Sequence, residues 1–155
     1  MTNIEYIQLQ NINRTELLAV LNKERIREHL VSHELFDEQK LDSWIEQKSM
    51  VDSSKGCRVR GIIVDNSVAG WGGIQFENGA YEIAIVLDER YWGIGRAVFK
   101  DLIAWAAELG HKVVVLHLFN TRPEYKFLKK MSLRVYESTM FGQKYKSYEL
   151  GVPHA

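Results

Sequence analysis

The stretch from Tyr81 to Leu109 constrains this chain most, because it joins three patterns that need different backbone shapes. Apolar and polar residues alternate over residues 81–88, which is typical of a half-buried strand. From Val98 onwards, apolar residues recur at spacings of four, three and four, as they do on one face of a helix. Gly93 and Gly95 lie between the two patterns. The stretch therefore predicts a strand, a tight turn and a long amphipathic helix.

The glycine turn is suited to an anionic ligand. Glycines have no Cβ, so backbone N–H groups can approach a bound group closely. The first turn of the following helix adds unpaired N–H groups and the positive end of the helix dipole. A dinucleotide fingerprint would need a third glycine where this chain has Val98, and no Gly-Lys-Ser/Thr closes a P-loop. The turn is predicted to bind phosphate, the alternative being an ordinary connection whose glycines serve only the turn.

The turn reads Arg90-Tyr91-Trp92-Gly93-Ile94-Gly95 and resembles the Arg/Gln-x-x-Gly-x-Gly/Ala signature of the GCN5-related N-acetyltransferases, the GNAT family. The resemblance covers most of the chain and implies one α+β domain over residues 1–155. That fold has a mixed, mostly antiparallel sheet of about seven strands flanked by about four helices. The resemblance also implies acetyl-CoA as co-substrate. The residues expected to bind it are Ile85, Val86, Leu87, Arg90, Tyr91, Trp92, Gly93, Ile94, Gly95, Arg96, Ala97 and Asn120.

The remaining pattern agrees with that fold. Strands are expected at residues 4–9, 58–65, 67–77, 80–87, 112–119, 134–139 and 144–150. Asn78-Gly79 is a strong hairpin signal, so the second to fourth strands are expected to form an antiparallel meander. The apolar strand at 112–119 follows a helix and is expected to run parallel to its neighbour. Three glycines inside the strand at 67–77 predict a bulge or a close backbone approach.

Two helices are expected between the first and second strands, and a short one after the fifth strand. Asn13 and Asp37 are predicted N-caps, and the helix after Asp37 places Leu41, Trp44, Ile45 and Lys48 on one face. A short helix is expected at residues 122–131, with Pro123 tolerated in its first turn.

Acetyl transfer to an amine needs a proton acceptor, since an amine of pKa about 10.4 is neutral in only about one part in several thousand at neutral pH. It also needs donors for the oxyanion that forms on the thioester carbonyl. Glu82 lies early on the fourth strand, where many members of the resembled family carry a catalytic glutamate, so it is the candidate base. The alternative is a solvated carboxylate on a strand.

The general acid is less clear in this sequence. The resembled family usually carries a tyrosine on the short helix after the fifth strand, and alignment places Leu128 there. Tyr125, three residues earlier, is the candidate replacement, and the alternative is that it only packs. A thiolate leaving group of pKa near 8.5 needs little protonation, so loss of the acid does not exclude transfer.

No metal site is expected. His29 and His33 have helical spacing, but no third ligand follows, and solvated residues are the simpler interpretation. His117 lies inside an apolar strand and is expected to be a hydrogen-bonded core histidine, with catalysis as the minor alternative.

Composition limits the partners. The formal net charge is zero and the pI is about 7.0, which favours neither nucleic acid nor an anionic membrane. Cys57 is the single cysteine, so no internal disulfide can form, and a cytoplasmic location is expected. Exposed sheet edges would allow a homodimer.

The sequence therefore predicts an N-acetyltransferase that moves an acetyl group from acetyl-CoA to an amine, by direct attack in a ternary complex. The acceptor, a small molecule or a protein, is not specified by these residues. Two alternatives stay open: a catalytically degenerate domain that binds acyl-CoA as a sensor or interaction module, and a different enzyme built on a nucleotide-binding loop.

Overall fold

A computed structural model describes residues 2–24, 26, 35–119, 122, 125–140 and 142–154. Its strands are β1 (Ile4–Ile7), β2 (Arg58–Val64), β3 (Ser67–Glu77), β4 (Ala80–Leu87), β5 (Val113–Phe119), β6 (Ser132–Met140) and β7 (Gln143–Gly151). Its α-helices are α1 (Arg14–Leu21), α3 (Glu38–Asp52), α4 (Gly95–Glu108) and α5 (Lys126–Met131), and two short 3-10 helices are η1 (Leu9–Asn11) and η2 (Glu89–Ile94). Among these described segments, no helix is both long and apolar enough to span a bilayer.

The seven strands form one sheet in the order β1-β2-β3-β4-β5-β7-β6. β4 and β5 run parallel, and the other neighbouring strands are antiparallel. The parallel pair is joined through α4, as a crossover between parallel strands requires. The predicted α+β fold with a mixed, mostly antiparallel sheet is therefore confirmed.

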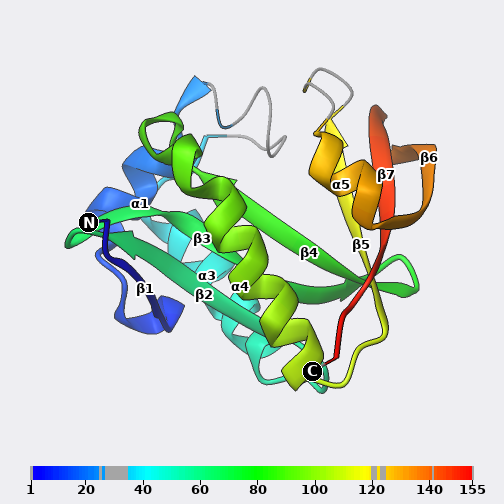
Figure 1. Cartoon of the computed structure of the whole chain (residues 1–155). Coiled ribbons are helices and arrows are strands. Elements are labelled where there is room, and N and C mark those ends of the chain that lie inside the picture. The colour runs from blue at the N-terminus through cyan, green and yellow to red at the C-terminus, as the bar shows by residue number, and fades with distance from the viewer. Residues whose placement is uncertain are drawn as a thin grey trace.

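Helices cover both faces of the sheet (Figure 1). α4 lies on one face, where Val98 and Leu102 are fully buried in a core with Ile83 and Leu116. α1 and α3 lie on the other face, in a second core that contains Trp71. Because side chains alternate along a strand, Glu82, Ala84 and Val86 of β4 face the α1 and α3 side.

Two glycines of β3 allow its neighbours to approach closely, as the sequence predicts. A Cβ on Gly73 would lie 2.1 Å from the carbonyl oxygen of Arg58, and one on Gly70 would lie 1.8 Å from that of Val86. The β2–β3 register also shifts between Ile62 and Ile63. The tight packing fixes β4 against β3 and so fixes the position of the residues that β4 carries.

β4 and β5 are paired only near the start of β4. The paired residues are Glu82 with Val115 and Ile83 with Leu116. Beyond them the strands diverge, and the gap opens toward the end of the sheet where α5 and the N-terminus of α4 lie (Figure 1). Ile85 to Leu87 therefore run along the gap, with no β5 residue paired to them among the described residues.

Some element boundaries differ from the expectation. The first strand ends at Ile7, since Leu9 is already in η1. The last two strands are longer than predicted. The short helix begins at Lys126, not at residue 122, because the backbone of Tyr125 is extended (φ −107°, ψ 116°). Pro123, His29 and His33 lie outside the described residues.

Candidate active site

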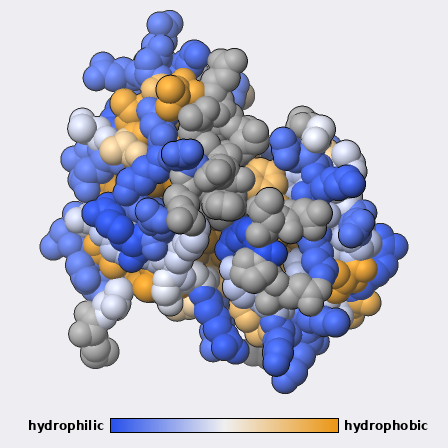
Figure 2. All heavy atoms as spheres, turned by 90° about the horizontal axis from the view of Figure 1, so that it is seen from above, coloured by the Kyte–Doolittle hydropathy of each residue, from blue (hydrophilic) through white to orange (hydrophobic). Residues whose placement is uncertain are grey.

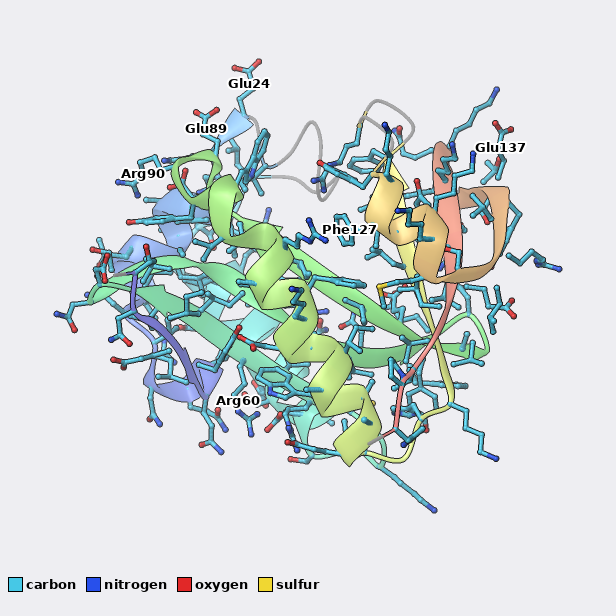
Figure 3. All side chains as sticks on the ribbon, viewed as in Figure 1. Glu24, Arg60, Glu89, Arg90, Phe127 and Glu137 are labelled. Carbon is cyan, nitrogen blue, oxygen red and sulfur yellow. The ribbon has the colours of Figure 1, made fainter. Side chains whose placement is uncertain are left out.

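A cavity of about 680 Å³ occupies the gap between β4 and β5, within the size range of ligand sites. β3 and α3 line one end of it, and the N-terminus of α4 and residues of α5 line the other. Phe127 points from α5 toward α4 (Figure 3), and its ring centroid lies 5.6 Å from that of Phe99. The end of the molecule toward which the gap opens carries mostly hydrophilic side chains, with hydrophobic atoms between them (Figure 2).

The glycine turn forms the α4 end of the cavity. Trp92, Gly93, Gly95 and Arg96 line it. A Cβ on Gly93 would meet no atom within 4 Å, and one on Gly95 would meet only a Leu87 methyl group at 3.9 Å. The space beside both glycines is therefore open to a ligand.

The N-terminus of α4 also differs from those of α1 and α3. Asn13 caps α1 and Asp37 caps α3, each accepting a hydrogen bond from the backbone N–H three residues later. No side chain caps α4, and its first turn has no acidic residue. The Gly95 N–H donates to the Trp92 carbonyl, but no carboxylate in this turn offsets the positive end of the helix dipole, which favours an anion such as a phosphate.

A buried carboxylate holds the turn in place. Asp88, whose side chain is fully buried, accepts hydrogen bonds from Lys23 Nζ at 2.7 Å and Arg90 Nη2 at 2.9 Å. Burial by itself would raise the pKa of Asp88, but these bonds hold it below its ordinary value. The indole N–H of Trp92 donates to the Leu87 carbonyl at 2.7 Å and ties the turn to β4.

Asp88 was missed at the sequence level. An aspartate at the end of an apolar strand, next to the turn, was a signal for it, but Lys23 reaches it only through the tertiary fold. The same carboxylate binds the guanidinium group of Arg90, whose contact with acetyl-CoA stays a prediction.

The other predicted acetyl-CoA contacts divide into two groups. Ile85, Val86 and Leu87 line the cavity, and so does Arg96, whose guanidinium carbon lies 4.9 Å from the centroid of the Phe127 ring. Four predicted residues do not line it: Arg90, Tyr91, Ile94 and Ala97. Asn120 lies outside the described residues.

Glu82 lies at the other end of the cavity from the turn. Its side chain is 14% exposed, and Gln75 Nε2 donates to its Oε1 at 2.9 Å. Burial, aided by the nearby carboxylate of Glu77, raises the pKa of Glu82 to about 7, although Gln75 and Lys48 act in the opposite direction. The solvated-carboxylate alternative therefore does not fit this environment, and a carboxylate that titrates near neutral pH is suited to proton transfer.

Lys48 of α3 lies beside this carboxylate. Its Nζ donates to Gln75 Oε1 at 2.8 Å and lies 4.7 Å from the centroid of the Trp71 ring. Burial lowers the pKa of Lys48. The sequence placed Lys48 on the apolar face of its helix, but did not indicate that it would meet Gln75 and Glu82.

His117 lines the cavity next to Glu82. Its Nδ1 lies 2.6 Å from Ser147 Oγ, and its Nε2 lies 3.7 Å from Glu82 Oε2. Burial lowers the pKa of His117, so the ring is neutral at pH 7. The expected hydrogen-bonded histidine is confirmed, with one nitrogen directed at the candidate base.

Tyr125 precedes α5 and lines the same cavity. Arg122 Nη2 donates to its hydroxyl at 2.9 Å. Leu128, at the place of the family tyrosine, is buried. Tyr125 is thus near the gap, and its role as an acid stays a prediction.

The arrangement combines a helix N-terminus without a side-chain cap and a carboxyl group whose pKa is about 7. The backbone of Ile85 to Leu87 runs between the two and can hydrogen-bond an extended ligand. Among the residues that the structure describes, no group of three or more His, Cys, Asp or Glu side chains is placed to hold a metal ion.

Comparisons with known proteins agree with this geometry. A family model described as the acetyltransferase (GNAT) family matches residues 20–131, more than half of the 155-residue chain. A search of curated proteins found no match.

Solved structures show the same fold at low sequence identity. A Bordetella pertussis protein described as a GNAT-family acetyltransferase has a TM-score of 0.75 at 16% identity, and the match covers 96% of this chain and 95% of that one. An N-acetyltransferase from Staphylococcus aureus Mu50 has a TM-score of 0.71 at 16% identity, covering 99% of each chain. A Salmonella typhimurium protein described as an acetyltransferase, solved with its cofactor acetyl-CoA, has a TM-score of 0.67 at 13% identity and covers 100% of this chain and 96% of that one.

Proposed function

Because the chain belongs to the GNAT family of acetyltransferases, we propose that it transfers an acetyl group from acetyl-CoA to an amine by direct attack in a ternary complex. One observation carries the proposal: a single cavity reaches from the uncapped glycine turn to Glu82. The turn supplies an anion site, and Glu82 supplies a base that titrates near neutral pH. Acetyl-CoA carries phosphates at one end and a reactive thioester at the other. Its phosphates would lie at the glycine turn and its thioester near Glu82.

The residues of the turn fit the phosphate end. Gly93 and Gly95 leave open space where a Cβ would point, and Arg96 contributes a positive charge at the same end. The N–H groups of the first turn of α4 would hold the pyrophosphate, and the strand backbone from Ile85 to Leu87 would hold the pantetheine arm. The fit extends to the thioester, whose carbonyl oxygen would receive backbone N–H donors at the gap.

Glu82 performs the proton transfer in this proposal. It accepts the proton from the amine nitrogen as the C–N bond forms and the C–S bond breaks. The thiolate departs with the electron pair of the C–S bond, and its low basicity makes a strong acid unnecessary. Tyr125 is near enough to the cavity to serve as that acid when one is needed.

A second candidate function is a domain that binds acyl-CoA without turning it over. The observation that favours it is Leu128, which stands at the family's tyrosine place and cannot donate a proton. Turnover with any amine would exclude a purely binding role.

Thermal unfolding with acetyl-CoA tests the cofactor directly. At a hundred times its dissociation constant, a ligand adds about 2.7 kcal/mol to the free energy of unfolding, which raises the midpoint by several degrees. We expect this shift with acetyl-CoA and none with ATP or NAD. A shift with a nucleotide and none with acetyl-CoA would contradict the proposal.

The Lys48→Met substitution tests the base through its pH dependence. The positive charge of Lys48 lowers the pKa of Glu82, so its removal is expected to raise that pKa above its value of about 7. Because the base acts in its ionised form, the acid limb of kcat/KM should then move to higher pH.

The measurement is kcat/KM against pH for the wild type and the variant. Lys55→Met makes the same chemical change at an exposed position and should leave the limb unchanged. A limb that stays in place in Lys48→Met, or moves to lower pH, would show that the titrating group is not Glu82.

A further inference from the structure

Glu82 belongs to a row of polar side chains that crosses the sheet on the α1 and α3 side. Gln75 of β3 donates to Glu82 of β4, and His117 of β5 follows, with its Nε2 3.7 Å from Glu82 Oε2. Ser147 of β7 lies 2.6 Å from His117 Nδ1, and Ser138 of β6 lies 2.9 Å from Ser147. The row thus occupies five neighbouring strands, but the proposed function uses only Glu82.

The sheet register brings these residues together. His117 is paired with Ser147, and Glu82 is paired with Val115, two positions before His117 and on the same face. Ser147 is fully buried, and the side chain of His117 is only 15% exposed. Buried polar atoms are costly unless they are hydrogen-bonded, so the contacts between these residues are part of the folded state.

The two serines can set which nitrogen of His117 carries a proton, since each of the two contacts allows either direction of donation. When Ser147 donates its hydroxyl proton to Ser138, its oxygen accepts from Nδ1–H of His117. The Nε2 lone pair then faces Glu82 and can accept a proton. In apo enzymes such catalytic contacts are often longer than a hydrogen bond and shorten when substrate binds, which fits the 3.7 Å separation.

We propose that Glu82 and His117 act together as a two-group proton acceptor, with Ser147 and Ser138 as positioning residues that keep Nε2 of His117 free to receive the proton from Glu82. The proposal rests on the proposed function, because it takes Glu82 as the group that first accepts the amine proton. It extends that function by assigning roles to three further residues.

The proton balance of the step is simple. One proton leaves the amine nitrogen for Glu82 as the new C–N bond forms, and it then moves to Nε2 of His117. Glu82 is a carboxylate again, and His117 is an imidazolium with a proton on each nitrogen. His117 returns this proton to water through the open cavity after the products leave. The thiolate takes nothing from the pair, and no group is oxidised or reduced.

Burial disfavours the charged form of each group of the pair. It raises the pKa of Glu82 to about 7 and lowers that of His117. Three further titratable groups face the pair: Lys48 from α3, Glu77 from β3 and the Tyr145 hydroxyl from β7. Because the two groups lie 3.7 Å apart, the charge of either one changes the proton affinity of the other, so their titrations are coupled.

His117→Asn is the first test. Asparagine can place an amide atom near the position of Nδ1, so it can keep the contact with Ser147 while the Nε2 acceptor is lost. We expect kcat to fall about tenfold or more, with unchanged acetyl-CoA affinity and midpoint of unfolding. The pH profile of kcat should change from that of the pair to that of one carboxyl group.

The wild-type protein provides a second test that needs no variant to fold. ¹⁵N NMR of its histidines should show His117 with the proton on Nδ1 at neutral pH. In the Ser147→Ala variant, the preference of the His117 ring for a proton on Nδ1 should weaken. Its kcat should fall, while the KM for acetyl-CoA stays the same. A purely structural role of Ser147 would leave the tautomer unchanged.

The outcomes separate this inference from the proposed function. A wild-type ring protonated on Nε2, or a His117→Asn variant with normal kcat and pH profile, would overturn the two-group acceptor. If Glu82→Gln is inactive in the same assays, Glu82 as base still stands. Normal turnover in the Glu82→Gln variant would contradict both the two-group acceptor and Glu82 as the base.

Discussion

Replacing Glu82 by Gln is expected to lower kcat about 100-fold or more while acetyl-CoA affinity stays unchanged. Glutamine has the same shape and keeps an oxygen that can accept from Gln75, which now donates to Glu82 at 2.9 Å. What it loses is the ability to accept a proton. The substitution therefore removes the base without opening a space in the buried row.

The measurement is kcat and KM across the pH range, with acetyl-CoA binding followed by thermal unfolding. In the wild type, kcat/KM should fall as the pH drops below about 7, since Glu82 is then protonated. Glu77→Gln is the matched comparison, because it removes a carboxylate in the same cavity. That carboxylate raises the pKa of Glu82, so its loss should move the acid limb to lower pH and leave alkaline turnover in place.

A Glu82→Gln variant with normal turnover at every pH would exclude Glu82 as the base. A variant that loses acetyl-CoA binding as well would indicate that Glu82 shapes the site instead of taking a proton. The two readouts must therefore be recorded on the same preparation.

Gly93→Val and Gly95→Val are expected to weaken acetyl-CoA binding about 100-fold. Each substitution fills open space at the α4 end of the cavity, where the phosphates are proposed to lie. The loss of two charge-assisted hydrogen bonds of about 1.5 kcal/mol each corresponds to that change in affinity. Because a Cβ meets no close atom at either position, the fold should tolerate both variants.

Isothermal titration with acetyl-CoA measures the effect, and circular dichroism checks the fold. Lys100→Val controls for the helix propensity of valine, because Lys100 is exposed on α4 and does not line the cavity. It should bind acetyl-CoA with wild-type affinity. Wild-type affinity in both glycine variants would mean that the turn is not the phosphate site.

Much of the fold could be predicted because its signals are local. The boundaries of β3 and β4 were correct, since a glycine hairpin separates two runs of strand-forming residues. The caps Asn13 and Asp37 were also correct, because each accepts a hydrogen bond from a residue three positions later. Such features depend on neighbours in the sequence and are visible in it.

The start of α5 could not be predicted in the same way. Because proline is tolerated in the first turn of a helix, this helix was expected to begin at residue 122. In the structure, Tyr125 adopts an extended backbone beside the cavity. There the Arg122 guanidinium binds its hydroxyl, and the backbone N–H of Arg122 donates to the Phe119 carbonyl. Contacts with the end of β5 thus outweigh the helical tendency of these residues.

The site shows the same division. Its glycine turn was recognisable because the spacing, the preceding strand and the following helix are all local. Arg90 was assigned to the phosphate site by its position in the motif, which stays a prediction, and the structure adds that its guanidinium group binds Asp88. Lys23 binds the same carboxylate from 65 residues away, and sequence spacing cannot reveal that contact.

By itself, the sequence determined the order of strands and helices and the glycine turn, which follow from short-range periodicity and backbone preference, and the turn motif carried the family resemblance. Only the tertiary structure decided that Glu82 would titrate near pH 7 and meet His117, 35 residues later in the chain. The physical reason is that a pKa depends on burial and on the charges nearby. Those are set by which strands become neighbours and by where β4 and β5 part, and no local pattern contains that information.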